Sequence, residues 1–154
     1  MAASRASTPE EALEKLERYC AFQERCHQEV RSKLLKLGIY GDDLEAIIAQ
    51  LISDDFLNEE RFARTFARGR FRIKKWGRKR IEQELKRRAV PAYSIRKGME
   101  EIEEDEYLRV LAEQAEKKAA SLKESDAYIR KNKVARYLIG RGYEPQLVWE
   151  AIGE

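Results

Sequence analysis

The 154-residue sequence lacks features that several classes of protein require. It has no run of about 18 apolar residues, so we expect no membrane-spanning helix. The first residues, MAASRASTPEE, lack the apolar segment of a secretory signal. Glycine (8) and proline (3) are scarce, and no glycine-rich phosphate-binding motif is present. These absences favour a helical protein of the cytoplasm.

Residues that perform chemistry are also few. The chain has one histidine and two cysteines, and Cys20 and Cys26 are six positions apart, which fits neither a CxxC redox pair nor a usual zinc pattern. His27 is adjacent to Cys26, but a structural zinc ion needs four ligands. No nucleophile, histidine and acid form a recognisable catalytic set. We therefore predict that the chain is not an enzyme and binds no metal or cofactor.

Charge, in contrast, is abundant and segregated. The 28 residues from Arg61 to Arg88 contain 13 lysines or arginines and only two acids, a net charge of +11. Residues 1–60 carry −6, residues 89–127 carry −4 and residues 128–154 carry +2. A basic segment between acidic ones indicates a polyanion or an acidic protein groove as the partner.

The basic segment keeps helical spacing. At about 100° per residue, one apolar stripe forms before Gly77 and a second forms after it. We expect the aromatic residues of the first stripe to pack in the core, with Phe71 as an exception that lies off the stripe. The two stripes contain Phe62, Phe66, Gly69, Ile73 and Trp76, and then Ile81 and Leu85.

The cations opposite these stripes form the candidate binding surface. A solvated face is the alternative, but acids at i,i+4 spacing would then relieve the repulsion, and arginine outnumbers lysine nine to four, which favours bidentate contacts with phosphate or carboxylate groups. The residues that we predict to contact a partner are Arg64, Arg68, Arg72, Lys75, Lys79, Lys86 and Arg87.

A helical pattern recurs three times along the chain. Each copy has apolar residues at fixed spacing, a small residue at a helix end and an apolar residue directly after it. The copies lie 51 and then 53 residues apart. They are Val30, Leu34, Gly38, Ile39, Leu44 and Ile48; Ile81, Leu85, Ala89, Val90, Ile95 and Met99; and Val134, Leu138, Gly142, Tyr143, Val148 and Ile152.

This recurrence predicts an all-α protein of three tandem three-helix repeats, stacked into an elongated, curved body. We expect a disordered tail at residues 1–7 and repeats at residues 8–57, 58–104 (the basic one) and 105–154. Thr8, Pro9 and Glu11 have the spacing of a capping box at a helix start, and Asn58 is the expected N-cap of the ERFA helix.

Two stretches, SDDFLNEERFARTFARGR and WGRKRIEQELKRRAVP, resemble the signature of the RecX family of bacterial recombinase modulators. The resemblance is strongest over residues 53–103 and extends more weakly over nearly the full chain. One departure is Val90-Pro91, where the family pattern has glycine followed by an apolar residue.

The resemblance implies a cytosolic regulator without enzymatic activity, and we expect the protein to be a monomer. Proteins of this family bind the RecA recombinase filament on single-stranded DNA and restrain strand exchange, ATP hydrolysis and coprotease activity. The main alternative is a protein that binds single- or double-stranded DNA directly through residues 61–88. A third alternative is a helical scaffold whose basic patch docks an acidic protein.

Overall fold

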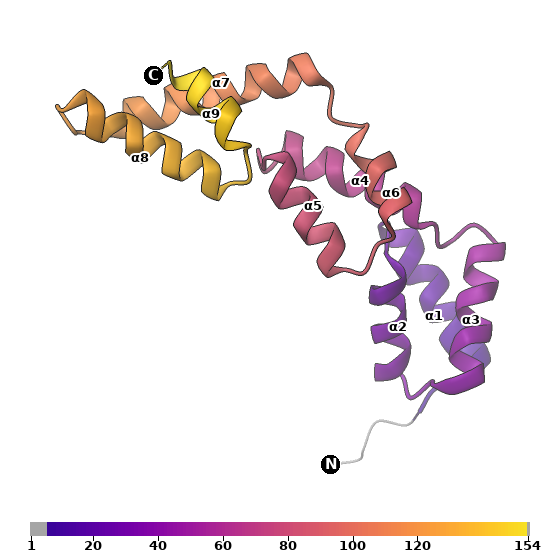
Figure 1. Ribbon diagram of the computed structural model, residues 1–154. Coiled ribbons are helices and arrows are strands. Elements are labelled where there is room, and N and C mark those ends of the chain that lie inside the picture. The colour runs from indigo at the N-terminus through magenta and orange to yellow at the C-terminus, as the bar shows by residue number, and fades with distance from the viewer. Residues whose placement is uncertain (1–5, 154) are drawn as a thin grey trace, which may run out of the picture.

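The computed structural model describes residues 6–153, which form nine α-helices and no strand (Figure 1). Residues 1–5 of the predicted disordered tail lie outside this range, whereas the Ser7 amide donates a 2.9 Å hydrogen bond to the Leu37 carbonyl. The helices are α1 (Pro9–Phe22), α2 (His27–Lys36), α3 (Gly41–Ser53), α4 (Glu59–Arg72), α5 (Arg78–Arg87), α6 (Ala92–Met99), α7 (Glu104–Ser121), α8 (Ala127–Gly140) and α9 (Pro145–Ile152).

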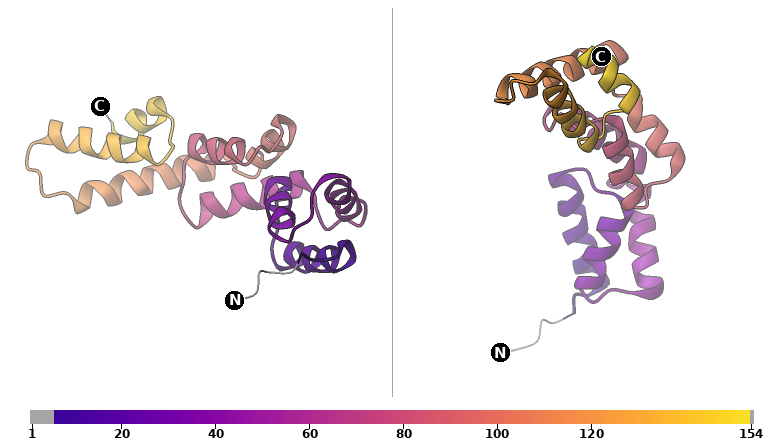
Figure 2. Two further views of the ribbon diagram at one scale, coloured as in Figure 1. Left: turned by 90° about the horizontal axis from the view of Figure 1, so that it is seen from below. Right: turned by 60° about the vertical axis from the view of Figure 1, so that its left-hand side comes forward.

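The helices pack in consecutive threes, here named repeat 1 (α1–α3), repeat 2 (α4–α6) and repeat 3 (α7–α9). All extensive helix–helix packing is within a triplet, and that between α4 and α6 is the most extensive. The triplets follow one another along a bent rod, with repeats 1 and 3 at opposite ends (Figure 2). The predicted all-α fold of three stacked three-helix repeats in an elongated, curved body is confirmed.

The predicted helix starts are also confirmed. Thr8 and Glu11 form a reciprocal capping box in front of α1, with Pro9 as its first residue. The Asn58 side chain accepts a 2.9 Å hydrogen bond from the Arg61 amide and so caps α4. Such caps satisfy amide groups that have no partner inside the helix.

The second helix of every repeat ends in the same turn. Gly38, Ala89 and Gly142 have positive φ angles of 82°, 57° and 102°, the left-handed conformation that closes a helix. The next residue, which is apolar and buried, donates its amide back to a leucine of the preceding turn. These amide-to-carbonyl hydrogen bonds are Ile39 to Leu34 (3.0 Å), Val90 to Leu85 (3.1 Å) and Tyr143 to Leu138 (3.2 Å).

The Ala89 turn provides the first testable prediction. The Cβ of a left-handed alanine crowds the backbone, at a cost of about 1–2 kcal/mol that glycine avoids. We expect Ala89→Gly to raise the free energy of unfolding by about 1 kcal/mol in urea denaturation. Ala112→Gly, an exposed position within α7, should instead lower it by about 0.5–1 kcal/mol. A loss of stability in both variants would contradict the prediction.

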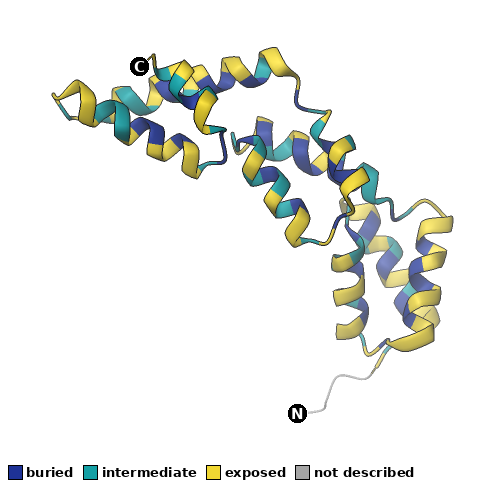
Figure 3. Ribbon diagram, in the orientation of Figure 1, coloured by how far each residue is buried: buried dark blue, intermediate teal, exposed yellow. Residues whose placement is uncertain are grey.

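The buried residues, coloured dark blue in Figure 3, form two separate cores. One is confined to repeat 1 and is centred on Leu16, Leu34 and Leu51, all 0% exposed. The other runs through repeats 2 and 3 without a break and also includes Cys26 from the α1–α2 connection. Repeats 2 and 3 therefore share one core, whereas repeat 1 has its own.

The junction of repeats 2 and 3 is also connected by hydrogen bonds. The amides of Gly77 and Lys79 donate to the carbonyls of Arg141 and Gly142, both at 2.9 Å. The Tyr143 hydroxyl donates to the Lys75 carbonyl at 2.8 Å, and burial raises the pKa of Tyr143 to about 12. The start of α5 is thus joined directly to the end of α8.

Helix α4 differs from its predicted form at the C-terminal end. It ends at Arg72, because Lys75 takes a left-handed conformation (φ 59°) and the Trp76 amide turns back to the Arg70 carbonyl at 3.1 Å. Ile73 therefore leaves the predicted stripe and is 79% exposed. Phe71, predicted as the exception, is fully buried, with its ring 5.7 Å from that of Tyr107.

Candidate partner-binding surface

The basic segment occupies α4, the α4–α5 connection and α5, all on repeat 2. Among residues 6–153, seven of its 13 cations form ion pairs and six do not. The paired residues are Arg61, Arg64, Arg68, Arg72, Arg78, Arg87 and Arg88. The other six, which we name the unpaired cation set, are Arg70, Lys74, Lys75, Lys79, Arg80 and Lys86.

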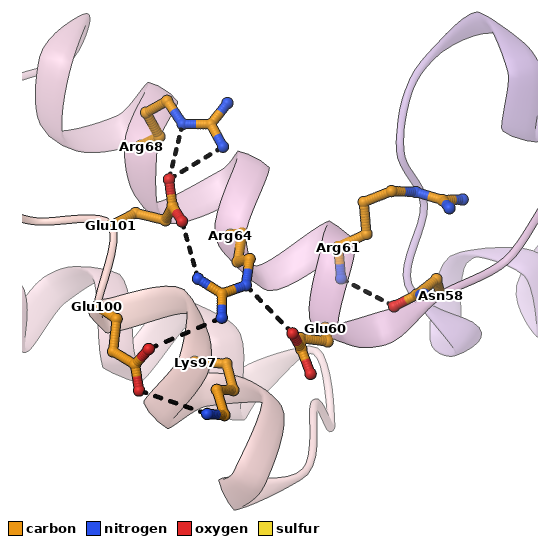
Figure 4. A network of polar contacts seen from close by, with 8 residues as sticks. All are labelled: Asn58, Glu60, Arg61, Arg64, Arg68, Lys97, Glu100 and Glu101. Atoms are coloured by element: carbon orange, nitrogen blue, oxygen red, sulfur yellow. Dashed lines mark hydrogen bonds and ion pairs between the residues drawn. The ribbon is translucent and has the colours of Figure 1, made fainter.

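The arginines predicted on the outer face of α4 contact acids of the same molecule (Figure 4). Arg64 lies 3.2 Å from Glu60, one turn earlier, and 2.8 Å from Glu101, which follows α6. Arg68 lies 3.0 Å from the other oxygen of Glu101. The hydrogen bond from Arg64 is the main reason why the pKa of the Glu101 carboxyl is below its ordinary value.

Arg72 follows the same pattern, with its guanidinium 3.6 Å from Glu106 at the start of α7. The acidic run 100–106 places its carboxylates beside α4 because α6 packs closely on that helix. The prediction that Arg64, Arg68 and Arg72 form an uncompensated cationic face is therefore wrong. Their charges are largely balanced by acids of the same chain, so they do not form a free cationic surface.

The predicted lysines differ from these arginines. Lys75, Lys79 and Lys86 have no ion pair within residues 6–153. Lys79 and Lys86 are seven residues apart on α5, on the side opposite the fully buried Ile81 and Leu85. The structure thus brings these two lysines together on one exposed helix face.

Arg87, the last predicted residue, is intermediate between these two groups. It pairs with Glu84 at 2.9 Å, at i,i+3 spacing on the same helix, but its side chain remains 76% exposed. Exposed pairs of this type contribute little free energy. Arg87 can therefore exchange Glu84 for another anion at low cost.

Three arginines that were not among the predicted site residues stack on aromatic rings. The Arg70 guanidinium lies 4.4 Å from the centre of the Phe66 ring, and that of Arg80 lies 4.1 Å from the centre of the Trp76 ring. Arg88 also lies over Phe66, at 4.8 Å. Helical periodicity could not predict these contacts, because the connection after α4 folds back and brings Trp76 between α4 and α5.

Arg61 and Arg78 connect the repeats to one another. Arg61 bridges Glu24, at 2.7 Å, and Asp55, at 3.1 Å, and so ties α4 to repeat 1. Arg78 pairs with Glu144 at 2.9 Å, and its guanidinium lies 3.8 Å from the centre of the Tyr107 ring in repeat 3. Neither guanidinium is available for a partner without loss of a junction contact.

The Tyr107 hydroxyl completes the contact between repeats 2 and 3. It accepts a 3.0 Å hydrogen bond from the Arg78 amide and donates one to Glu144. Burial is the main cause of the raised pKa of Tyr107, and the hydrogen bond to Glu144 raises it further. The Tyr107 side chain therefore helps to hold repeats 2 and 3 together.

The described residues contain no group of three or more histidine, cysteine or acidic side chains placed to hold a metal ion. Cys20 and Cys26 are buried free thiols in the two different cores. Burial raises the pKa of both thiols to about 11. They are therefore protonated and poorly nucleophilic near neutral pH.

The chain matches two domain models of one family. Residues 58–99 match the second three-helix domain of RecX, and residues 104–152 match the third three-helix domain of RecX. The chain belongs to the RecX family. The regulatory protein RecX of Prosthecochloris aestuarii is 29% identical over 148 residues, which cover 96% of this chain and 95% of the relative.

Other RecX proteins give a consistent result. The regulatory protein RecX of Salmonella paratyphi A is 32% identical over 150 residues and covers 89% of each chain. The crystal structure of RecX from Lactobacillus salivarius superposes with a TM-score of 0.84 at 22% identity, over 94% of both chains, which supports the fold. No helix within residues 6–153 has the length and apolar character needed to cross a bilayer.

Proposed function

We propose that this RecX-family chain binds RecA recombinase filaments on single-stranded DNA in the cytoplasm and inhibits their recombinase, ATPase and coprotease activities. Family membership supports the class of function. The structural observation that carries the proposal is the unpaired cation set, six cations without an acidic partner within residues 6–153, all on the central repeat of a curved rod.

The rod is suited to a polymeric host. Repeats 2 and 3 share one core and are joined through backbone hydrogen bonds, so they should move as one body. Such a body can contact successive protomers of a filament while Lys79 and Lys86 face anionic groups of the protein or of its bound DNA. Electrostatic complementarity of this kind increases the association rate and the specificity.

The test is charge reversal of the exposed α5 face. Lys79→Glu/Lys86→Glu should abolish inhibition of DNA-dependent ATP hydrolysis by RecA and co-sedimentation with the filament. Both side chains are exposed and have no ion pair within the described residues, so the free energy of unfolding should change by no more than about 0.5 kcal/mol. Lys117→Glu/Lys123→Glu is the matched control, because it changes net charge equally at exposed lysines of repeat 3.

Inhibition that survives in the α5 variant would show that this face is not the binding surface. Arg64→Glu/Arg68→Glu would be a poorer test. Removal of those guanidinium groups leaves Glu101 beside new carboxylates, so we expect that variant to lose stability as well. A loss of inhibition there would not separate binding from folding.

Direct binding of a nucleic acid is the second candidate. The observation that favours it is the stacking of Arg70 and Arg80 against Trp76. Arginine beside an aromatic ring is typical of sites that bind single-stranded nucleic acids. Direct binding should weaken steeply as salt increases, in proportion to the phosphates contacted. Filament binding should instead require RecA and survive moderate salt. Co-sedimentation with filaments, bare DNA and free RecA distinguishes the two.

A further inference from the structure

Repeat 1 contains an open groove that is separate from the basic surface of repeat 2. It lies along α1 and the facing side of α2 and has a volume of about 510 Å³. All the charged residues that line it are cations, and the others are two aromatic residues and a leucine. The lining residues are Lys15, Arg18, Tyr19, Phe22, Arg25, Lys33 and Leu37.

The groove contrasts with the rest of its repeat. Residues 6–57 contain eleven acids and six basic residues, a net charge of −5, yet four of those six basic residues line the groove. Of the other two, Arg31 pairs with Glu45 at 2.6 Å. The groove is therefore a local positive site on an acidic body, which the net charge of the repeat conceals.

The four cations have no carboxylate partner among the described residues. The Arg25 guanidinium lies 3.7 Å from the centre of the Tyr19 ring and donates a 3.0 Å hydrogen bond to the Tyr19 carbonyl. The Lys33 ammonium lies 5.6 Å from the same ring. Phe22, at the end of α1, is 82% exposed. The groove thus combines cations that form no ion pair within residues 6–153 with apolar surface in contact with water.

We propose that this groove binds a short acidic segment of a partner protein, one that carries an apolar side chain between its carboxylates. The cations fit the carboxylates, and Phe22 with Leu37 fits the apolar side chain. The acidic surroundings favour a short peptide over a nucleic-acid strand. A strand has a charge at every nucleotide and would continue from the groove onto the acidic surface of repeat 1.

The test uses the full chain and a fluorescein-labelled peptide of alternating aspartate and leucine residues, followed by fluorescence anisotropy. We expect the parent protein to bind this peptide and not its asparagine counterpart. Arg18→Glu/Lys33→Glu should weaken binding by about tenfold or more, and Phe22→Ala should weaken it several-fold. The control Lys117→Glu/Lys123→Glu should stay within about twofold of the parent, because the same charge change lies far from the groove.

The outcomes separate this site from the surface of repeat 2. Lys79→Glu/Lys86→Glu should keep peptide binding, so the proposed function can fail while the groove proposal stands, and the reverse also holds. Absence of peptide binding, or an equal loss in the repeat 3 control, would overturn the proposal. A labelled oligodeoxythymidine is the competing probe, and its binding should not change in Arg18→Glu/Lys33→Glu. If oligonucleotide binding depends on these two cations, the ligand of the groove is a nucleic-acid strand and not an acidic peptide.

Discussion

Replacement of Gly77 by alanine should lower the free energy of unfolding by about 3 kcal/mol, the upper range for overpacking in a filled site. A Cβ at this position would lie 2.2 Å from the carbonyl carbon of Gly142 and 2.3 Å from the amide of Tyr143. Both are backbone atoms, so no rotamer change can relieve the clash. Relief requires α5 and α8 to separate, which breaks the hydrogen bonds from Gly77 and Lys79.

Urea denaturation monitored by circular dichroism measures this effect. Gly69→Ala is the matched control, since it makes the same chemical change within α4 with no heavy atom within 4 Å of the new Cβ. That variant should gain about 0.5–1 kcal/mol from the higher helix propensity of alanine. Parent-like unfolding of Gly77→Ala would show that the backbone junction of repeats 2 and 3 does not stabilise the protein.

The fold could be predicted from the sequence because its determinants are local and repeated. The left-handed turns at Gly38, Ala89 and Gly142, each followed by an apolar residue, depend on neighbours within one helix turn. Local signals also give the helix starts at Thr8 and Asn58. Three copies of one spacing then determine how the units follow one another.

The binding surface could be predicted only in part, because a helical wheel gives the direction of a side chain and not its neighbours. Glu101 lies 37 residues after Arg64 and 33 after Arg68, so no i,i+4 argument could reveal their pairing. Lys79 and Lys86 of α5, in contrast, have no acidic partner within residues 6–153, which a helical wheel could not distinguish from the paired arginines of α4. The groove of repeat 1 was not predicted, because its cations come from α1, α2 and the connection between them, in a repeat with negative net charge.

Because the two cores are separate, truncation of a buried leucine should destabilise the part of the molecule that contains it. Leu34 and Leu85 occupy equivalent positions in repeats 1 and 2, and both are 0% exposed. Truncation of either to alanine should cost about 2–5 kcal/mol, since it removes buried methyl groups and leaves a cavity. The two variants should nevertheless differ in which part of the molecule unfolds first, because Leu34 belongs to the core of repeat 1 and Leu85 to the core shared by repeats 2 and 3.

Tryptophan fluorescence can detect this difference. The chain has two tryptophans, Trp76 in repeat 2 and Trp149 in repeat 3, so their emission reports on the shared core, whereas circular dichroism reports on all helices. For Leu34→Ala the dichroism transition should move to lower urea while the fluorescence transition stays near that of the parent. For Leu85→Ala both should move. The contacts across the junction of repeats 1 and 2, such as Arg61 with Glu24 and Cys26 in the shared core, oppose this separation. If the fluorescence transition of Leu34→Ala moves as far as its dichroism transition, the contacts between repeats 1 and 2 are strong enough for the whole rod to unfold as one cooperative unit.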